Sequence, residues 1–295
     1  MPVRVAIIDV GSNTVRLLVA ERSKSGLRPL REERVFLGLG EEIERLGWIS
    51  AEKAAETVAT AAEYAAIARE LRVELMNVVV TAPGRQSANG EELMRALESA
   101  THARVRVLTP DEEGELAFEG ALASADPGVR SIAVCDVGGG STEVVVGTPS
   151  GGIAWCRSFD IGCLRLTHRV LVDDPPDAKR IEAARREVED HLHELTPPLA
   201  EAALITGGTA RALRKVVGRR LGRDELEEAL RRLTKRPSAE IAKKYAIDRV
   251  RARTLVAGTL ITMAVQERVA IPLEVSRSGL REGAAAELLG ELAAA

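Results

Sequence analysis

The chain has 295 residues, of which 45% are hydrophobic and 29% are charged, and its formal net charge is −3. This length and apolar content are enough for two domains with cores of their own. The net charge argues against general attraction to nucleic acid, so any basic surface has to be local. Cys135, Cys156 and Cys163 form no CxxC pair and no even-numbered framework, which indicates a reducing compartment and small buried side chains.

Two features bear on where the protein works. Residues 1–8 lead directly into an apolar, strand-like run, so we expect no secretory signal. The longest apolar run, residues 255–265, is too short to cross a bilayer. We therefore expect a soluble, cytoplasmic protein without a membrane or nucleic-acid partner.

The first pattern in chain order is AIIDVGSNTVRLLV at residues 6–19. Two apolar, β-branched runs joined by a short glycine-containing turn predict a pair of strands. Asp9 lies near the end of the first run. The turn that follows consists of Gly11, Ser12, Asn13 and Thr14.

Strand and helix patterns then alternate as far as residue 108. We expect a turn and a strand in 26–40, a helix in 52–71 capped by Ser50, a strand in 76–80, a loop in 81–90, a helix in 91–101 and a strand in 105–108. Arg85 lies in the loop that follows a strand. Its guanidinium would match phosphate oxygens in pairs, although an ordinary surface position is the alternative.

Thr109 and Pro110 predict the start of a further helix, with Thr109 as its N-cap and Pro110 at its first position. Its first turns carry four acids within five positions: Asp111, Glu112, Glu113 and Glu115. These acids could simply complement the helix dipole. Alternatively, one of them faces a cleft and accepts a proton from water, with neighbouring charges raising its pKa. The residue pattern does not choose among the four.

We place the domain boundary in residues 124–128, SADPG, which break this helix. The first domain then covers residues 1–125 and the second covers 126–295, with the last helix free to pack back on the first domain. Strands alternating with helices in both halves predict α/β domains.

The second domain opens with RSIAVCDVGGGSTEVVVG, residues 130–147. Three glycines without Cβ atoms allow backbone N–H groups to converge on a phosphate, and Asp136 is placed to hold a cation over it. A glycine-rich hairpin with a solvated aspartate is the alternative. The residues of this turn are Gly138, Gly139, Gly140, Ser141 and Thr142.

A shift of 127 positions superimposes the two hairpins without a gap. It places Asp9 on Asp136 and Gly11 on Gly138. Two such loops imply two related domains that face each other across a cleft, each offering an aspartate and a phosphate turn. We therefore expect a phosphate-handling site.

The remaining elements are a strand in 153–159, helices in 165–172 and 178–195, a strand in 203–205, mostly helix from 224 to 272, a strand in 273–275 and a helix in 280–292. A third glycine turn, Gly207, Gly208 and Thr209, leads from a strand into a helix. A helix N-terminus of small residues is a natural anion site.

Other charged residues are less specific. Arg165 is a second candidate phosphate clamp. Residues 211–236 contain ten Lys or Arg against four Asp or Glu, which indicates either a track for an anionic chain or a solvated helix face. The histidines lack metal spacing and are interpreted as structural or exposed: His102, His168, His191 and His193.

Together these motifs resemble the exopolyphosphatase and guanosine pentaphosphate phosphohydrolase family, which belongs to the actin-like, sugar-kinase and Hsp70 ATPase superfamily. The resembling segments run nearly end to end: IDVGSNTVRLLV (8–19), TAPGRQSANG (81–90), TPDEEGELAFEGA (109–121), DVGGGSTEVVVG (136–147), DIGCLRLTHRVL (160–171), ITGGTARAL (205–213) and SRSGLREG (276–283). The resemblance implies two ribonuclease H-like, actin-like domains that flank a phosphate-binding cleft.

The resemblance also implies roles for particular residues. Glu113 matches the family's catalytic base, Asp136 and Glu143 match its magnesium (or manganese) site, and Asp9 looks like a further cation or water ligand. Arg85 matches an arginine of the family's substrate loop. The terminal phosphates would be held by Ser12, Asn13, Thr14 and the backbone from Gly138 to Thr142. The implied substrates are inorganic polyphosphate and guanosine penta- or tetraphosphate.

Two departures from the family pattern matter. Gly114 and Glu115 stand where the family carries alanine and arginine, which replaces a cation with an anion. From the resemblance we also expect no HD-type C-terminal domain of the kind that longer members carry. We therefore expect short chains to be preferred and released after each cut. A weakly active sensor of these phosphates and an actin-like kinase or ATPase remain alternatives, and a homodimer remains open.

Overall fold

The computed structural model describes residues 2–23, 26–126 and 128–294. It divides into two compact units: unit 1 is Met1–Ala123 with Leu280–Ala295, and unit 2 is Ser124–Gly279. The first break lies two residues before the division expected at 125/126. The segment after Gly279 belongs to unit 1, which agrees with the option that the last helix packs back on the first domain. Pro127, in the expected break, lies outside the described residues.

Unit 1 contains a five-stranded mixed sheet in the order β3-β2-β1-β4-β5. β1 pairs antiparallel with β2 and parallel with β4. The strands are β1 (Arg4–Val10), β2 (Thr14–Ser23), β3 (Gly26–Phe36), β4 (Leu75–Val80) and β5 (Arg104–Val107).

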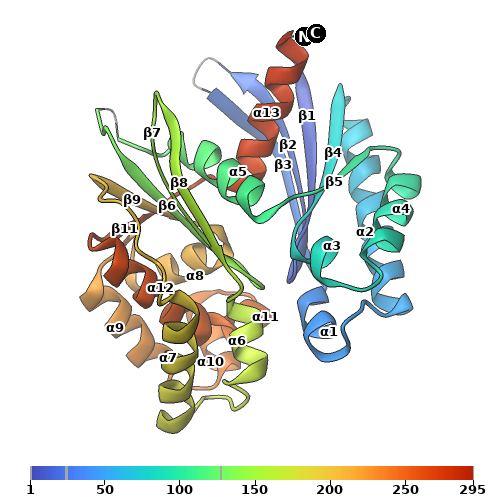
Figure 1. The fold of residues 1–295 in the computed structure, drawn as a ribbon. Helices are drawn as coiled ribbons and strands as arrows, with labels where there is room; N and C mark the ends of the chain where they lie inside the picture. Colours follow the sequence, from blue (N-terminus) through green and yellow to red (C-terminus); the bar gives the residue numbers. More distant parts are fainter. Residues whose placement is uncertain (1, 24–25, 127, 295) are drawn as a thin grey trace. The chain divides into compact units, whose positions relative to one another are not determined.

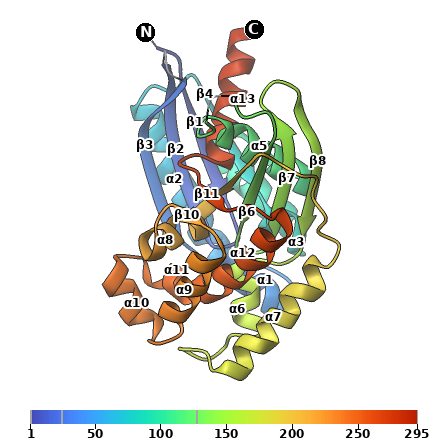
Figure 2. The same ribbon diagram turned by 90° about the vertical axis from the view of Figure 1, so that its left-hand side faces the viewer.

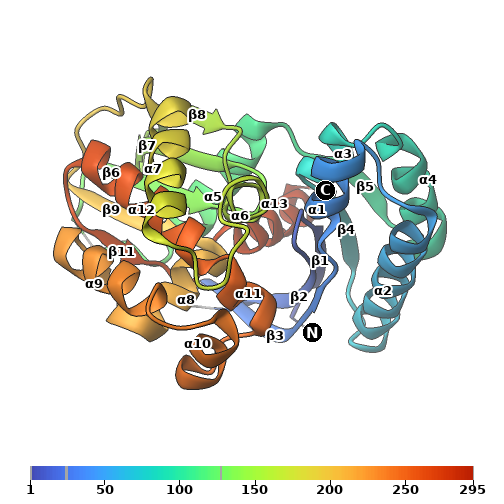
Figure 3. The ribbon, with the colours of Figure 1, turned by 90° about the horizontal axis from the view of Figure 1, so that it is seen from below.

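Helices cover both faces of this sheet, as Figures 1 and 3 show. They are α1 (Leu39–Leu46), α2 (Ala51–Glu70), α3 (Ala82–Gln86), α4 (Gly90–Thr101), α5 (Pro110–Leu122) and α13 (Leu280–Ala294). Ile8 of β1 packs in the core that includes α2 and α4, whereas Ile7 packs in the core that includes α13. This alternation is the period of two that buries both faces of a strand.

Local capping explains where these helices begin. The Ser50 hydroxyl accepts a hydrogen bond from the Lys53 amide (3.2 Å), as expected for an N-cap. Residues 81–90 were expected as a loop, and this was wrong for Ala82–Gln86, which form α3. Pro83 lies in the first turn of α3, where its fixed φ favours a helix start.

The two helices α5 and α13 pack at backbone distance. A Cβ added to Gly283 would lie 2.0 Å from the Leu116 carbonyl oxygen. Ala284, Ala285 and Leu288 of α13 are almost fully buried at this face. Glycine at position 283 is therefore required for α13 to close the second core of unit 1.

Unit 2 contains a six-stranded mixed sheet in the order β10-β11-β9-β6-β7-β8. Its strands are β6 (Ile132–Val137), β7 (Thr142–Thr148), β8 (Gly152–Phe159), β9 (Ala202–Thr206), β10 (Arg220–Leu221) and β11 (Leu273–Val275). Its helices are α6 (Cys163–Arg169), α7 (Ala178–Leu192), α8 (Gly207–Val217), α9 (Arg223–Leu233), α10 (Ser238–Tyr245), α11 (Arg249–Arg253) and α12 (Leu255–Val269). One continuous core joins Ala133, Cys135 and Val137 of β6 to these helices. The labels in Figure 2 locate β6 and the helices of unit 2.

The two sheets share one topology. Read from the first hairpin outward, unit 1 has β3-β2-β1-β4-β5 and unit 2 has β8-β7-β6-β9-β11, with β10 added at the edge. The expected α/β fold of two related domains is confirmed. No helix in the described part of the chain combines the length and apolar content that a membrane span requires.

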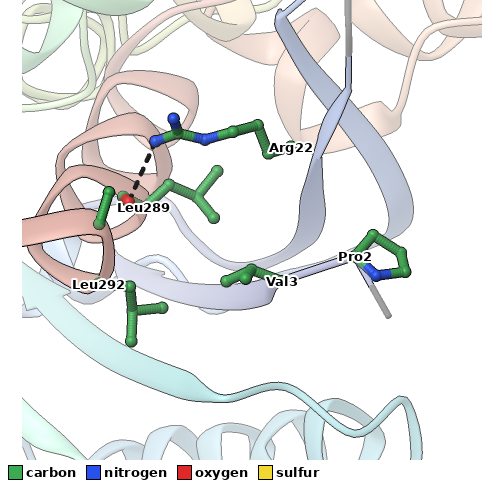
Figure 4. Close-up of a pocket in the computed structure, with 6 residues that line it drawn as sticks. Pro2, Val3, Arg22, Leu289 and Leu292 are labelled. Carbon is green, nitrogen blue, oxygen red and sulfur yellow. Dashed lines mark hydrogen bonds between the residues drawn. The ribbon is translucent and has the colours of Figure 1, made fainter.

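An apolar pocket of about 340 Å³ lies in unit 1, where β1 begins (Figure 4). Its lining includes Val3, Leu289 and Leu292, and Arg22 donates a hydrogen bond to the Leu289 carbonyl oxygen (3.1 Å). Asp9 and the glycine turn lie at the other end of β1, about 20 Å away at 3.3 Å per residue. The pocket is therefore separate from the phosphate turn and is too apolar to suit a polyanion.

Candidate functional site

The hairpins β1–β2 and β6–β7, whose sequences match at a shift of 127 positions, have the same backbone structure. In unit 1 the Gly11 amide donates to the Thr14 carbonyl oxygen (3.0 Å), and in unit 2 the Gly138 amide donates to the Ser141 carbonyl oxygen (3.0 Å). The strand registers also correspond at the shift of 127. The turns therefore have equivalent backbone hydrogen bonds as well as similar residues.

In unit 2, α6 holds the glycine turn from one side. The Leu164 and Arg165 amides donate to the Gly139 carbonyl oxygen (2.9 and 3.2 Å). A trans peptide directs its N–H away from its C=O, so the Gly140 amide points away from α6. A Cβ on Gly162 would lie 2.3 Å from Gly139, so glycine is needed at this approach. α6 begins at Cys163, two residues before the expected start, because its first amides bind the turn.

In unit 1, α1 holds the equivalent turn in the same way. The Gly40 amide donates to the Ser12 carbonyl oxygen (2.7 Å), which directs the Asn13 amide away from α1. Asn13 is 5% exposed, and neither its Nδ2 nor its Oδ1 has a hydrogen-bond partner among the described residues. Buried polar atoms are rarely left unpaired, so this side chain is a candidate for contact with a ligand or a water molecule.

Two carboxylates face each other beside the unit 2 turn. Asp136 and Glu143 are direct cross-strand partners in β6 and β7, so their side chains share one face of the sheet. Glu143 is 3% exposed and accepts a hydrogen bond from the Ser158 hydroxyl (2.8 Å). Two opposed carboxylates repel unless a cation or proton lies between them, and paired carboxylates are a usual protein contribution to a magnesium site. The donor set therefore fits the implied cation.

The corresponding pair in unit 1 has different chemistry. Asp9, 9% exposed, is the cross-strand partner of Arg16, whose Nε donates to the Thr14 hydroxyl (3.1 Å). A carboxylate opposite a guanidinium already has a positive neighbour. No group of three or more His, Cys, Asp or Glu side chains with metal-site geometry occurs among residues 2–23, 26–126 and 128–294.

The structure distinguishes among the four acids of α5. Glu112 completes a capping box: the Glu112 amide donates to the Thr109 hydroxyl (3.2 Å), and the Thr109 amide donates to the Glu112 carboxylate (2.7 Å). The Thr109 amide, aided by Arg106, lowers the pKa of Glu112. Glu112 therefore stabilises the start of α5.

Glu113 is the buried acid of the four, with 8% exposure. Arg85 of α3 donates to its Oε1 (2.5 Å) and also to the Leu108 carbonyl oxygen, so Arg85 orients the carboxylate. Asp111 and Glu115 are exposed. Glu115 follows Glu113 by two positions, about 200° around the helix. Glu115 therefore lies on a different side of α5 from Glu113, and its effect as an anion near the substrate stays a prediction.

The third glycine turn adjoins the second. Gly207 begins α8 with φ +84°, and a Cβ there would lie 2.5 Å from Asp136 Oδ1. The Asp136 carboxylate therefore lies against the N-terminus of α8. The Thr209 hydroxyl donates to the Val137 carbonyl oxygen (3.0 Å), and the Thr142 hydroxyl donates to a backbone carbonyl oxygen in the same way (2.6 Å). These two hydroxyls hold the turns in place rather than face a ligand.

Arg251 of α11 belongs to this region and was not identified from the sequence. It is 7% exposed, and a Cβ on Gly208 would lie 2.5 Å from its Nη2. Its Nη1 contacts the Cys163 sulfur (3.6 Å), while its Nε has no partner within the described chain. The Thr206 hydroxyl, at the N-cap of α8, is also buried without a partner there. A buried guanidinium at a helix N-terminus fits an anionic ligand.

Other sequence candidates prove less specific. Arg165 forms an ion pair with Asp160 (3.1 Å) beside α6. Several arginines of the 211–236 run pair with glutamates of their own surface, at 3.3 Å for Arg223–Glu227 and 3.1 Å for Arg236–Glu240. This pairing favours the interpretation of the run as a solvated helix face.

The site residues thus fall into two sets. Unit 1 carries Asp9, Gly11, Ser12, Asn13, Thr14, Arg85 and Glu113, and unit 2 carries Asp136, Gly138, Gly139, Gly140, Ser141, Thr142, Glu143, Gly207, Gly208 and Thr209. Within unit 2 the second and third turns, both carboxylates and Arg251 adjoin one another. Within unit 1 Arg85 joins α3 to the buried acid of α5.

Comparison with known proteins gives one consistent result. A family model described as the Ppx/GppA phosphatase family matches residues 18–292. Exopolyphosphatase 2 of Mycobacterium tuberculosis is 32% identical over 198 residues, 64% of this chain and 61% of that relative, which is under two thirds of its length. Exopolyphosphatase 1 of Mycobacterium bovis is 29% identical over 302 residues, 95% of this chain and 86% of the relative.

Solved structures agree. The Ppx/GppA family member of Aquifex aeolicus is similar with a TM-score of 0.83 and 29% identity, covering 99% of both chains. A protein described as exopolyphosphatase-like has a TM-score of 0.89 at 25% identity, covering 98% of this chain and 100% of that one.

Proposed function

The chain belongs to the Ppx/GppA phosphatase family, and on this premise we propose that it releases terminal orthophosphate from inorganic polyphosphate, guanosine pentaphosphate or both. The reaction is hydrolysis of a phosphoanhydride bond. Short polyphosphate chains are the expected substrates, because five of the ten basic side chains in residues 211–236 form ion pairs with glutamates and not with a distant part of the polyphosphate chain: Arg219, Arg223, Arg231, Arg232 and Arg236.

The observation that carries this proposal is the separation of roles among the α5 acids. Glu112 is engaged at the helix cap, and Asp111 and Glu115 are exposed, whereas Glu113 is buried and oriented by Arg85. A general base has to be held in one position, and Arg85 holds the Glu113 carboxylate. In this proposal Glu113 accepts the proton of the attacking water.

The phosphate turns supply the binding. The N–H groups that α1 and α6 direct outward, the N-terminus of α8 and the guanidinium of Arg251 are donors suited to phosphate oxygens. Such donors are in place before the reaction, so they stabilise charge that develops on the transferring group. Leaving-group charge would be stabilised in the same way.

Asp136 and Glu143 are the residues that we propose to hold a divalent cation, magnesium or manganese, with Asp9 as a further ligand to cation or water. The bound ion would neutralise charge on phosphate oxygens. In this proposal the Ser158 hydroxyl, which donates to the Glu143 carboxylate, holds that carboxylate in position.

The test is phosphate release from long polyphosphate, tripolyphosphate and guanosine pentaphosphate, measured side by side with and without magnesium. Glu113→Gln should lower kcat by roughly 10²–10⁴-fold while phosphate binding stays within a few-fold. Glu112→Gln is the matched control and should retain kcat. Tight binding of all three compounds without release by the wild-type protein would instead indicate a sensor.

A further inference from the structure

The Asn13 side chain has one hydrogen-bond donor group and one acceptor to satisfy, whereas a phosphate oxygen can satisfy only the donor. Both polar atoms of its carboxamide are buried and lack protein partners among the described residues. Exchanging the Oδ1 and Nδ2 assignments would leave the same result, so the observation does not depend on how the amide is oriented. A ligand that completes this side chain has to supply one acceptor and one donor.

A polyphosphate terminus meets only half of this requirement. Its oxygens accept a hydrogen bond from Nδ2, but an ionised phosphate offers no proton to Oδ1. Water supplies the missing donor. The equivalent position in unit 2 is Gly140, which has no side chain, so the second turn offers backbone N–H groups alone.

We propose that Asn13 binds and orients the water that attacks the terminal phosphorus, an inference that rests on the proposed function. One O–H of this water donates to Asn13 Oδ1, and the other donates its proton to the Glu113 carboxylate. The water oxygen forms a bond to the terminal phosphorus as the bond from that phosphorus to the bridging oxygen breaks. The bridging oxygen keeps the electron pair and leaves with the shortened chain.

Two acceptors thus fix the two O–H bonds of the nucleophile, which leaves a lone pair of the water oxygen directed at phosphorus. Both acceptors belong to unit 1, Asn13 through the first turn and Glu113 through α5. Orientation of this kind contributes to the rate without contributing to substrate affinity.

The test is Asn13→Leu, a change of similar size that removes both polar atoms. We expect kcat to fall by about 10²-fold, with the affinity for tripolyphosphate within about three-fold. The unfolding midpoint without substrate should rise by about 2–4 °C, because an unpaired buried amide is replaced by an apolar group. A structural asparagine would change stability in the opposite direction.

Asn89→Leu provides that comparison. Both polar atoms of Asn89 are paired with the backbone of Ile49, at 3.0 Å for Oδ1 and 2.8 Å for Nδ2. We expect a lower midpoint and a kcat within about two-fold of wild type.

Three outcomes would overturn the inference. The first is a normal kcat for Asn13→Leu when the wild type is active. The second is a lowered midpoint, which would indicate a structural role. The third is recovery of kcat at high magnesium, which would make Oδ1 a cation ligand. Absence of phosphate release by the wild type itself would reject the proposed function and this inference with it.

Discussion

The first and second hairpins share a backbone and differ in chemistry. Their turns make equivalent hydrogen bonds, and each is held by the N-terminus of the short helix that follows the third strand of its sheet. Yet the pair opposite in the strands is Asp9 and Arg16 in unit 1 but Asp136 and Glu143 in unit 2. The two units therefore have the same turn geometry.

The two units differ in the side chains that they present near these turns. Unit 1 presents a neutral amide in its turn and a buried acid in α5, which suits proton transfer and handling of water. Unit 2 presents glycines, two carboxylates and a buried guanidinium, which suit a cation and an anion. The comparison shows that two units of one chain can keep the same topology while the side chains at their turns differ.

The largest expected effect is a difference in phosphate release between variants of Asp136 and Asp9. Asp136→Ala should abolish measurable phosphate release at ordinary magnesium, a loss of more than about 10²-fold, because it removes half of the carboxylate pair. Asp9→Ala should lower the rate less and raise the magnesium concentration for half-maximal activity less than Asp136→Ala does, since the cross-strand partner of Asp9 is Arg16. Magnesium titrations of both variants measure the difference. Equal shifts in magnesium requirement would show that both hairpins bind the cation.

An intermediate effect is expected on KM when the first glycine of each turn, Gly11 or Gly138, is replaced. A Cβ on Gly138 would lie 3.0 Å from the Ser141 backbone oxygen, whereas one on Gly11 would meet its nearest atom, the Thr14 oxygen, at an ordinary 3.5 Å. Gly138→Ala should therefore raise KM about ten-fold as the turn shifts, and Gly11→Ala should change it less than about three-fold. Steady-state kinetics of the two variants test this, and a larger effect at Gly11 would contradict it.

The smallest expected effect is on stability, and it tests the assignment of Glu112 as the acid that caps α5. The pKa of Glu112 lies below its ordinary value of 4.5, chiefly because the Thr109 amide donates to the carboxylate. A lowered pKa in the folded state stabilises the fold above the ordinary value, and this contribution is lost as the pH falls. Glu112→Gln should lower the unfolding midpoint by about 1–3 °C at neutral pH.

That difference between Glu112→Gln and wild type should shrink as the pH falls below 4.5, the ordinary value. Thermal unfolding of both proteins between neutral pH and pH 4 measures it. A difference that grows with acidification would show that the capping bond does not control the carboxylate.

Sequence predicted the features that are local. The hairpins, the Ser50 and Thr109 caps and the third glycine turn each depend on residues close together in the chain. The choice of Glu113 over Glu112 needed the capping geometry, because both acids precede the same apolar face. Arg251 could not be found in this way, since its neighbours Gly208 and Cys163 are 43 and 88 positions away in sequence. Its burial follows from packing between helices, which no local pattern records.

The return of α13 to unit 1 has a consequence for how the chain is made. Unit 1 is discontinuous, and the whole of unit 2 is inserted between its two parts. During synthesis, residues 124–279 emerge before α13 does, so unit 2 can complete its core while unit 1 still lacks the helix that covers Ile7 and Leu116. Domains generally fold as units as they leave the ribosome. Unit 1 can therefore complete its second core only after the whole of unit 2 has been synthesised.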